Sequence, residues 1–294
     1  MKRHCCILIL LLLICHGTDA APEVFSLAKD NSVIGSAISY KLEEGDSLIE
    51  VARKFDLGYN EIAAANPGLD PFVPDKNRPV VIPTSWILPE VRTGHGIVIN
   101  LSELRLYLFY KKGRTKYVRT FPIGIGSEGN DTPTGQFTVT QKIIRPSWHV
   151  PKSILQEKPY LPKVVPPGPE NPLGSHAMRL SLPGVLIHGT NKPWGVGRRV
   201  SHGCIRIYPE DIEALFPSVK KGHKVTILRQ PVKAGIREGK IYLEVHGEDA
   251  NSDSELLSNA MLLMTKKKLL GRVNTDKLYS AIREKKGMPV DISE

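Results

Sequence analysis

Cysteine is scarce in this chain, which contains four in 294 residues. Three of them, Cys5, Cys6 and Cys15, lie within the first twenty residues. If that segment is removed, Cys204 remains alone, and a lone cysteine cannot form an intramolecular disulfide. The sequence therefore excludes a disulfide framework. It leaves Cys204 either as a buried, inert residue or as a reactive thiol.

Long hydrophobic runs are also missing. The apolar run over residues 7–14 follows the basic residues Lys2 and Arg3, and it is too short to span a bilayer. Small residues at its end favour cleavage after Ala20, so we expect a signal peptide over residues 1–20 and an exported protein. No later stretch approaches the length of a membrane span. We therefore expect no transmembrane segment in the mature chain.

Acidic residues are outnumbered by basic ones. The formal net charge is +10 at pH 7, and loss of the first twenty residues would leave +9. A basic exported protein suits an anionic polymer such as cell wall or lipid headgroups. Nucleic acid is a poor partner outside the cytoplasm. The lysines are dispersed apart from runs such as 266–268, so a solvated surface explains much of this charge equally well.

The segment after the signal predicts a short leader, residues 21–38, and then a small unit. Asp46 or Ser47 can cap a helix in which apolar residues repeat at helical spacing. Asn60 can cap a second helix, which Pro67 ends. Strand-like residues flank the two helices, so the predicted order is strand, helix, helix, strand.

This unit, residues 39–83, reads "KLEEGDSLIEVARKFDLGYNEIAAANPGLDPFVPDKNRPVVIP" after its first two residues. It resembles a LysM domain over its whole length. The resemblance implies binding of the N-acetylglucosamine-containing glycan of peptidoglycan or chitin. The alternative is a βααβ spacer with no affinity for glycan.

From residue 94 onward the pattern is mainly β. Alternating or apolar segments predict strands at 97–99, 106–110, 117–121, 136–144, 184–187, 200–208 and 224–228. The segment 145–176 is rich in proline and cannot enter a central sheet. We expect it to form a long ordered loop, either a lid over a site or a surface excursion. A helix is predicted from Pro209, whose ring suits a first turn.

The C-terminal segment, residues 231–294, predicts a hairpin and two helices. The hairpin spans 231–247 and turns at 237–240, and the helices span 252–286 with a break near Gly271. This segment carries no chemical motif, so we interpret it as an accessory unit.

The chemistry of the chain centres on residues 188–212, which read "HGTNKPWGVGRRVSHGCIRIYPEDI". A thiol becomes nucleophilic when an imidazole, a positive charge or backbone N–H groups lower its pKa. His188 ends one predicted strand and Cys204 begins another, so adjacent strands would bring the two side chains together. Gly203 would let a substrate approach closely. The Gly203 and Cys204 amides could then face a developing oxyanion.

Other interpretations of these residues are weaker. His188, His202 and Cys204 would give zinc three ligands without a clear fourth. A papain-like hydrolase would place its cysteine before its histidine. Ser-x-x-Lys occurs at 26–29 and 218–221, but the Lys-Thr-Gly element of penicillin-binding enzymes is absent.

The segment "HGT…GVGRRVSHGCIRIYPEDI" resembles the signature of the YkuD-type L,D-transpeptidases. That signature is a histidine, about a dozen residues, and then Ser-His-Gly-Cys followed by arginine or asparagine. "GNDTPTGQFTV" at 129–139 matches a second family element, Thr-Pro-x-Gly-x-Phe. The resemblance covers residues 95–230. It implies a mainly β protein in which a YkuD-type β-sandwich follows the βααβ LysM domain and precedes the hairpin-plus-helices unit. With those flanks the chain is similar to the periplasmic Gram-negative branch of the family.

The resemblance implies a reaction. Cys204 is the nucleophile, and His188 is the general base and later the acid. The thiol attacks the diaminopimelate carbonyl of a tetrapeptide stem and expels D-Ala. The resulting thioester passes to an amine, either of a second stem, giving a 3–3 crosslink, or of an outer-membrane lipoprotein lysine. Arg206 would bind a substrate carboxylate or brace the loop.

The remaining residues of the signature are expected to shape the site: Gly189, Thr190, Ser201, His202 and Gly203. No metal and no organic cofactor is expected. Two other functions stay open. The same site could use water, giving an L,D-carboxypeptidase or an amidase that releases a lipoprotein. The chain could instead be a non-catalytic wall-binding protein that acts through its LysM block.

Overall fold

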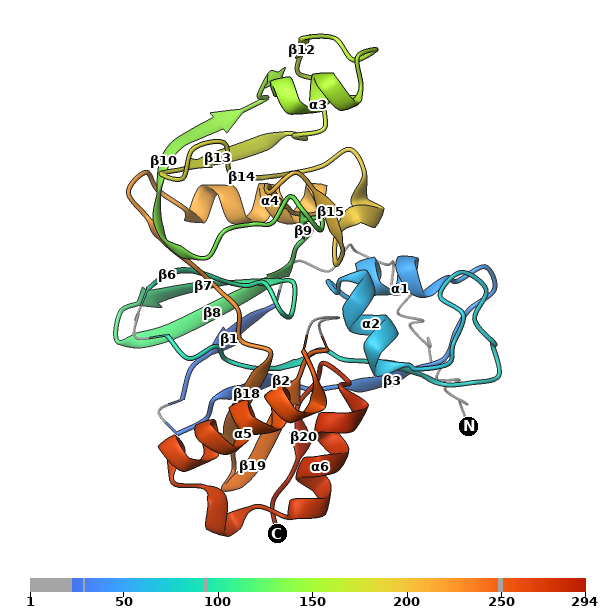
Figure 1. Cartoon of the computed structure of the whole chain (residues 1–294), viewed down its shortest axis with the longest axis vertical. Coiled ribbons are helices and arrows are strands. Elements are labelled where there is room, and N and C mark those ends of the chain that lie inside the picture. The colour runs from blue at the N-terminus through green and yellow to red at the C-terminus, as the bar shows by residue number, and fades with distance from the viewer. Residues whose placement is uncertain (1–22, 29, 92–94, 248–250) are drawn as a thin grey trace, which may run out of the picture.

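The computed structural model describes residues 23–28, 30–91, 95–247 and 251–294. The predicted signal peptide, residues 1–20, lies outside them. The protein is mainly β, as predicted. A large curled sheet carries an N-terminal block on one side and a C-terminal unit at one end (Figure 1). Among the described residues, no helix has both the length and the apolar character needed to cross a membrane.

The N-terminal block has the predicted order of strand, helix, helix, strand. β3 (Ile38–Tyr40) pairs antiparallel with β4 (Val80–Ile82), and α1 (Leu48–Lys54) and α2 (Tyr59–Ala65) lie between them in sequence. Asp46 and Ser47 were the two predicted caps of α1, and Ser47 is the one observed. The predicted cap of α2 was wrong. Gly58 takes the place of Asn60, because the Glu61 carboxylate accepts the Gly58 N–H at 2.7 Å.

The segment predicted as a leader forms two strands. β1 (Val24–Ser26) pairs with β8 (Thr115–Pro122) at the edge of the large sheet, and β2 (Val33–Gly35) pairs with β5 (Ser85–Ile87). Each has three residues, too few to show an alternating pattern. The chain is thus attached to the large sheet before it enters the N-terminal block.

The large sheet has nine strands in the order β1-β8-β7-β6-β17-β10-β13-β14-β16. Two neighbouring pairs, β6–β17 and β14–β16, are parallel. The long strand β10 pairs first with β17 and then, after a register shift near Val139, with β13, and such a shift bends a sheet. The strands not yet bounded are β6 (Gly96–Asn100), β7 (Arg105–Lys112), β10 (Gly135–Ile144), β13 (His176–Leu180), β14 (Leu186–His188), β16 (Ile205–Arg206) and β17 (Lys224–Leu228).

The sheet curls around an aliphatic core that α4 (Pro209–Leu215) completes. Ile212 and Leu215 of α4 are fully buried against residues of the central strands. A short parallel pair, β9 (Ile125–Gly126) with β15 (Arg199–Ser201), lies outside the nine-stranded sheet.

The proline-rich segment forms an ordered arm at the end of β10 and β13, as predicted for a segment outside the sheet (Figure 1). The arm contains β11 (Trp148–His149), α3 (Lys152–Glu157) and β12 (Val164–Val165). The buried Asn171 amide donates to the carbonyl oxygens of Pro146, Val165 and Pro166. One side chain therefore ties both ends of the arm together.

The C-terminal unit has its own core. The predicted hairpin and helix break are present, and β20 joins the hairpin as a third strand. Its elements are β18 (Val232–Arg237), β19 (Lys240–Val245), α5 (Asp253–Lys267), the 3₁₀ turn Leu270–Arg272, α6 (Thr275–Glu284) and β20 (Val290–Asp291).

A buried charged cluster joins the C-terminal unit to the large sheet. The Lys233 ammonium pairs with the Glu103 carboxylate and, at 2.8 Å, with Glu244. Nε2 of His246 lies 2.7 Å from Glu244. These two carboxylates and this imidazole are close enough to hold a metal ion, but the ammonium already contacts both carboxylates. The cluster therefore has the composition of an ion-pair network.

A buried ion pair and a backbone contact are among the interactions that hold the N-terminal block against the large sheet. In the first, the Arg105 guanidinium of β7 binds the Glu61 carboxylate of α2, with Nε 2.8 Å from Oε1, and both side chains are buried. Trp86 Nε1 also donates to that carboxylate, at 3.1 Å. A buried ion pair with added hydrogen bonds fixes geometry more firmly than an exposed one.

In the second contact, two backbones touch. A Cβ added to Gly197 would lie 2.1 Å from the Tyr59 nitrogen, and one added to Gly58 would lie 2.6 Å from the Gly197 Cα. The Asn60 N–H donates to the Gly197 carbonyl at 3.2 Å. Gly197 belongs to the segment between His188 and Cys204. The N-terminal block thus packs directly on the loop that connects the two predicted catalytic residues.

Candidate active site

His188 ends β14, as predicted, and Cys204 directly precedes β16, the neighbouring strand. The strand predicted over 200–208 was wrong, because the turn at 202–204 divides it into β15 and β16. β14 and β16 are parallel, with Ile187 opposite Ile205 and His188 opposite Arg206. Side chains alternate between the two faces of a strand, and paired residues share a face. Ile187 and Ile205 are fully buried in the core. His188, Cys204 and Arg206 therefore share the other face.

The His188 imidazole is buried and oriented. Its Nδ1 lies 2.5 Å from the Gly189 carbonyl oxygen, and that oxygen can only accept, so Nδ1 carries the proton. Nε2 is left with its lone pair. Burial lowers the pKa of His188 to about 4, and the nearby Arg206 guanidinium lowers it further, against the effect of the Gly189 carbonyl. At neutral pH this side chain is an uncharged base.

Cys204 is partly buried and immediately precedes β16. Its Sγ donates to the Gly184 carbonyl at 3.4 Å. Burial raises the pKa of the thiol, although the Leu186 backbone and the Arg206 and Arg179 guanidinium groups oppose the shift. In the free protein, His188 and Cys204 are therefore a neutral imidazole and a neutral thiol rather than an ion pair.

These pKa shifts predict how Cys204 reacts with an alkylating reagent. The rate of modification by iodoacetamide should rise about tenfold per pH unit from pH 5 to 8, because the thiolate is the reactive form. The profile should lie at higher pH than that of a cysteine-containing peptide, whose pKa is about 8.5. Peptide mapping of the Cys204 fragment measures the rate. A plateau between pH 5 and 8 would indicate a thiolate–imidazolium pair instead.

The turn before Cys204 is held by two hydroxyl groups. Gly203 has a φ of +95°, in the region that favours glycine. Ser201 Oγ donates to the Cys204 carbonyl at 2.6 Å, and Thr132 Oγ1 donates to the Gly203 carbonyl at 3.0 Å. In a planar trans peptide the C=O and N–H point in opposite directions. Fixing the Gly203 carbonyl on Thr132 therefore directs the Cys204 N–H away from it.

Thr132 is a site residue that the sequence did not predict. It is buried, and besides binding Gly203 it accepts the Gly126 N–H at 3.0 Å. The signal was present, because Thr132 lies in the quoted 129–139 segment. The sequence did not show that this segment meets Gly203, 71 residues further along.

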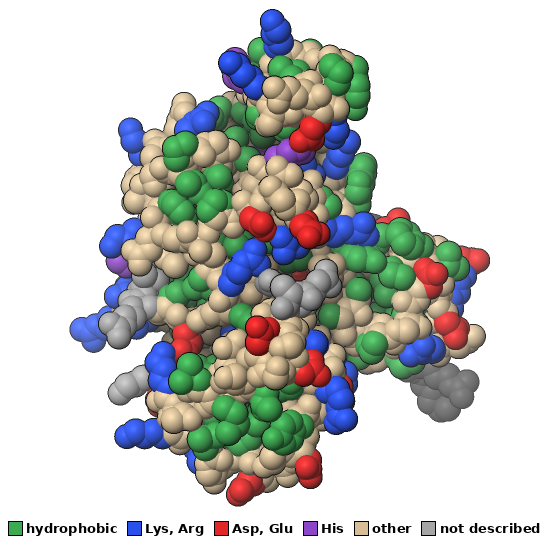
Figure 2. Space-filling model, in the orientation of Figure 1, with side chains coloured by type: hydrophobic (Ala, Val, Ile, Leu, Met, Phe, Trp, Pro, Cys, Tyr) green, Lys and Arg blue, Asp and Glu red, His purple; other side chains and the backbone are tan. Residues whose placement is uncertain are grey.

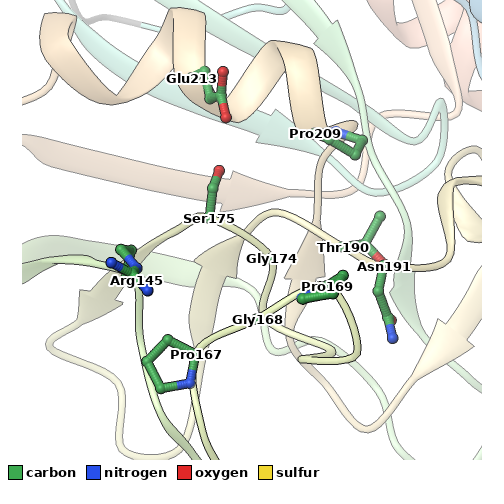
Figure 3. A pocket seen from close by; sticks show the side chains of 10 residues that line it. All are labelled: Arg145, Pro167, Gly168, Pro169, Gly174, Ser175, Thr190, Asn191, Pro209 and Glu213. Atoms are coloured by element: carbon green, nitrogen blue, oxygen red, sulfur yellow. The ribbon is translucent and has the colours of Figure 1, made fainter.

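Gly189 and Thr190 shape the loop that follows His188. A Cβ at Gly189 would lie 2.9 Å from the Ile212 side chain, so glycine allows α4 to pack closely. Thr190 is buried, and its Oγ1 accepts the Lys192 N–H at 2.9 Å. Thr190 also lines a cavity of about 340 Å³ with Arg145 and nearby prolines (Figure 3).

His202 contacts the Glu157 carboxylate, whereas His188 contacts the Gly189 carbonyl. The His202 side chain is exposed, and its Nε2 lies 3.1 Å from the Glu157 carboxylate of α3. This contact connects the proline-rich arm to the turn that precedes Cys204. The partner of the His202 imidazole is thus Glu157 and not the Cys204 thiol.

Arg206 and Arg179 complete the surroundings of Cys204. Arg206 was predicted from the sequence, whereas Arg179 was not, because it is an exposed residue of β13 with no motif around it. Other lysine and arginine side chains are spread over the visible face rather than gathered in one patch (Figure 2). Arg206 and Arg179 are the two positive groups whose charge acts on the Cys204 thiol.

A family model described as the L,D-transpeptidase catalytic domain, YkuD, matches residues 94–227. The probable L,D-transpeptidase YcfS of Escherichia coli (strain K12) is 38% identical over 262 residues, which cover 85% of this chain and 81% of that protein. The probable L,D-transpeptidase YbiS of the same strain is 36% identical over 292 residues, covering 94% of each chain.

Solved structures of L,D-transpeptidases are also similar to part of this chain. The NMR structure of the catalytic domain from E. faecium L,D-transpeptidase is 24% identical with a TM-score of 0.36, over 47% of this chain and 99% of that one. The X-ray structure of an L,D-transpeptidase from Mycobacterium tuberculosis H37Rv is 21% identical with a TM-score of 0.32, over 45% of this chain. The match spans 56% of that chain, little more than half of its length.

Proposed function

Because the chain belongs to the YkuD family of L,D-transpeptidases, a family of enzymes, we propose that it transfers peptidoglycan stem peptides through a thioester on Cys204. The observation that carries the proposal is the parallel pairing of β14 with β16. It sets a buried, uncharged His188 on the same face as the thiol. A nucleophile beside an oriented base is the arrangement required for acyl transfer.

The first half of the reaction forms the thioester. Nε2 of His188 takes the Cys204 proton as Sγ bonds to the diaminopimelate carbonyl carbon of a tetrapeptide stem. The Gly203 and Cys204 amides stabilise the oxyanion of the tetrahedral intermediate. The intermediate then collapses and its C–N bond breaks. The His188 imidazolium gives its proton to the amine of the departing D-Ala.

The second half passes the acyl group to an amine. The acceptor nitrogen attacks the thioester carbonyl, and neutral His188 takes a proton from it. The C–S bond breaks, and the imidazolium returns a proton to sulfur. The amine comes from the side chain of a second stem, giving a 3–3 crosslink, or from a lipoprotein lysine, giving a wall anchor. No step calls for a metal or an organic cofactor.

The N-terminal block is proposed to bind the glycan. Its βααβ order agrees with the LysM resemblance of residues 39–83. A loop at its far end exposes Phe72 and Val73, which the Asp70 carboxylate holds by accepting both of their backbone N–H groups. A periplasmic location follows from the proposed substrate and from the signal expected over residues 1–20.

Muropeptide analysis tests this function. The protein is incubated with tetrapeptide-containing sacculi and a peptide that ends in lysine, and the digest is analysed by mass spectrometry. Dimers linked through two diaminopimelates identify a crosslinking enzyme, and a peptide–muropeptide conjugate identifies an anchoring enzyme. Tripeptides alone would replace the proposal with a carboxypeptidase. An unchanged digest would reject catalysis and leave binding of the wall, which a sacculus pulldown measures.

A further inference from the structure

Two arginines flank Cys204 on one face of the sheet. Arg206 follows it by two residues on β16, which is the spacing of side chains on the same face of a strand. Arg179 lies on β13 opposite Leu186 of β14, and the β14–β16 register continues from Leu186 to Cys204. Both guanidinium groups lower the pKa of the thiol, which agrees with this proximity.

Neither arginine is neutralised within the part of the chain that the structure describes. The Arg206 guanidinium is partly buried and forms no ion pair or hydrogen bond there. Arg179 donates through Nε to the neutral Gln141 amide oxygen at 3.3 Å, and it forms no ion pair among those residues. By contrast, Arg199, also near the site, binds the Asp131 carboxylate at 2.5 Å.

An unpartnered guanidinium that is partly buried loses hydration without gaining an anion. Burial accordingly lowers the pKa of Arg206. A ligand carboxylate would compensate both cations, and arginine binds carboxylates with charge-assisted hydrogen bonds. The two residues thus have the composition of a carboxylate site whose anion is supplied by the substrate.

We propose that Arg179 and Arg206 together bind the terminal carboxylate of the acyl donor and thereby select stems whose leaving residue is free. The inference rests on the proposed function. In a tetrapeptide stem this carboxylate is separated from the nitrogen of the scissile bond by one carbon atom. It would therefore lie within a few ångströms of the reacting sulfur, and Cys204 shares its face of the sheet with both arginines. A stem whose terminal residue is already in amide linkage has no anion to offer.

The test compares two donors that differ in one group. One is a tetrapeptide stem ending in D-Ala, and the other is the same peptide ending in D-Ala amide. The wild-type protein should form the Cys204 thioester from the free acid with a kcat/KM about 10- to 100-fold higher, as expected for a charge-assisted hydrogen bond. Arg179→Gln should lower kcat/KM for the acid about tenfold or more and that for the amide far less, because loss of its charge raises the pKa of the thiol for both donors alike. Arg114→Gln, an equal charge change in an exposed turn, should behave as wild type.

The outcomes separate this inference from the proposed function. Equal thioester formation from both donors by the wild-type protein would reject the carboxylate site and leave the transpeptidase proposal standing. A loss in Arg179→Gln that is the same for acid and amide would also reject it, because a purely structural residue acts on both. Absence of any thioester from either donor would overturn both proposals.

Discussion

Replacing Cys204 with alanine is expected to lower the rate of transpeptidation by about 10⁴-fold or more, because the variant cannot form the covalent intermediate. The fold should be retained, since Cys204 is only partly buried and the hydrogen bond that its thiol donates to Gly184 is weak. The measurement is the yield of new muropeptides with time, together with the intact mass of the protein after exposure to donor stem alone.

Two further variants make this result specific. His188→Gln should also lose most activity while keeping an alkylatable thiol, because glutamine cannot take the sulfur proton. His202→Gln should keep most activity, since His202 contacts Glu157 rather than the thiol. Thermal unfolding of each variant checks that the fold is intact. An alanine variant that retains more than a few per cent of the wild-type rate would show that Cys204 is not the nucleophile.

Replacing Glu61 with alanine is expected to lower the free energy of unfolding by about 3–5 kcal/mol, the usual cost of breaking a buried ion pair from one side. The Arg105 guanidinium would remain buried without its anion, and the Trp86 Nε1 and Gly58 N–H groups would each lose an acceptor. Urea unfolding followed by circular dichroism measures the change.

The chain offers a matched control for that experiment. Glu210 of α4 pairs with Arg53 of α1 at 2.7 Å and bridges the same two parts of the protein, but both side chains are about 40% exposed. Glu210→Ala should therefore cost about 1 kcal/mol or less. Equal losses in the two variants would mean that burial of the Glu61–Arg105 pair does not stabilise the docking of the N-terminal block.

Hydrophobic periodicity in the sequence predicted most of the longer strands and helices. Alternation and apolar runs located the long strands, and the spacing of apolar residues located α1. The sequence indicated that His188 ends a strand and that Cys204 lies near the start of another, but the pairing of β14 with β16 is seen only in the structure. The edge strand β1 could not be predicted, because three residues carry no pattern and its partner lies about 90 residues away.

The missed site residues share one reason. Thr132 and Arg179 are ordinary residues in ordinary strand and loop sequences, and their importance comes from the segment each one meets in space. Thr132 reaches Gly203, and Arg179 reaches the neighbourhood of Cys204 across two strand pairings. Contacts between residues so far apart in the chain depend on the order of strands in the sheet, which cannot be read from a single sequence. The N-cap of α2 was misassigned because a glycine can cap through its backbone when Glu61 lies three residues on.

The backbone contact between Gly58 and Gly197 would restrict where a glycan bound by the N-terminal block can lie relative to Cys204. A binding module on a flexible linker explores a sphere around its anchor, and its effective concentration falls as the linker lengthens. Here the N-terminal block packs directly against the loop before Cys204, since the backbone at Gly58 touches the backbone at Gly197. A glycan strand held by the block would therefore stand at one distance and one angle from the sulfur. Only the stems that project toward the thiol at that angle would be processed, and the spacing of the bonds would be set by the protein.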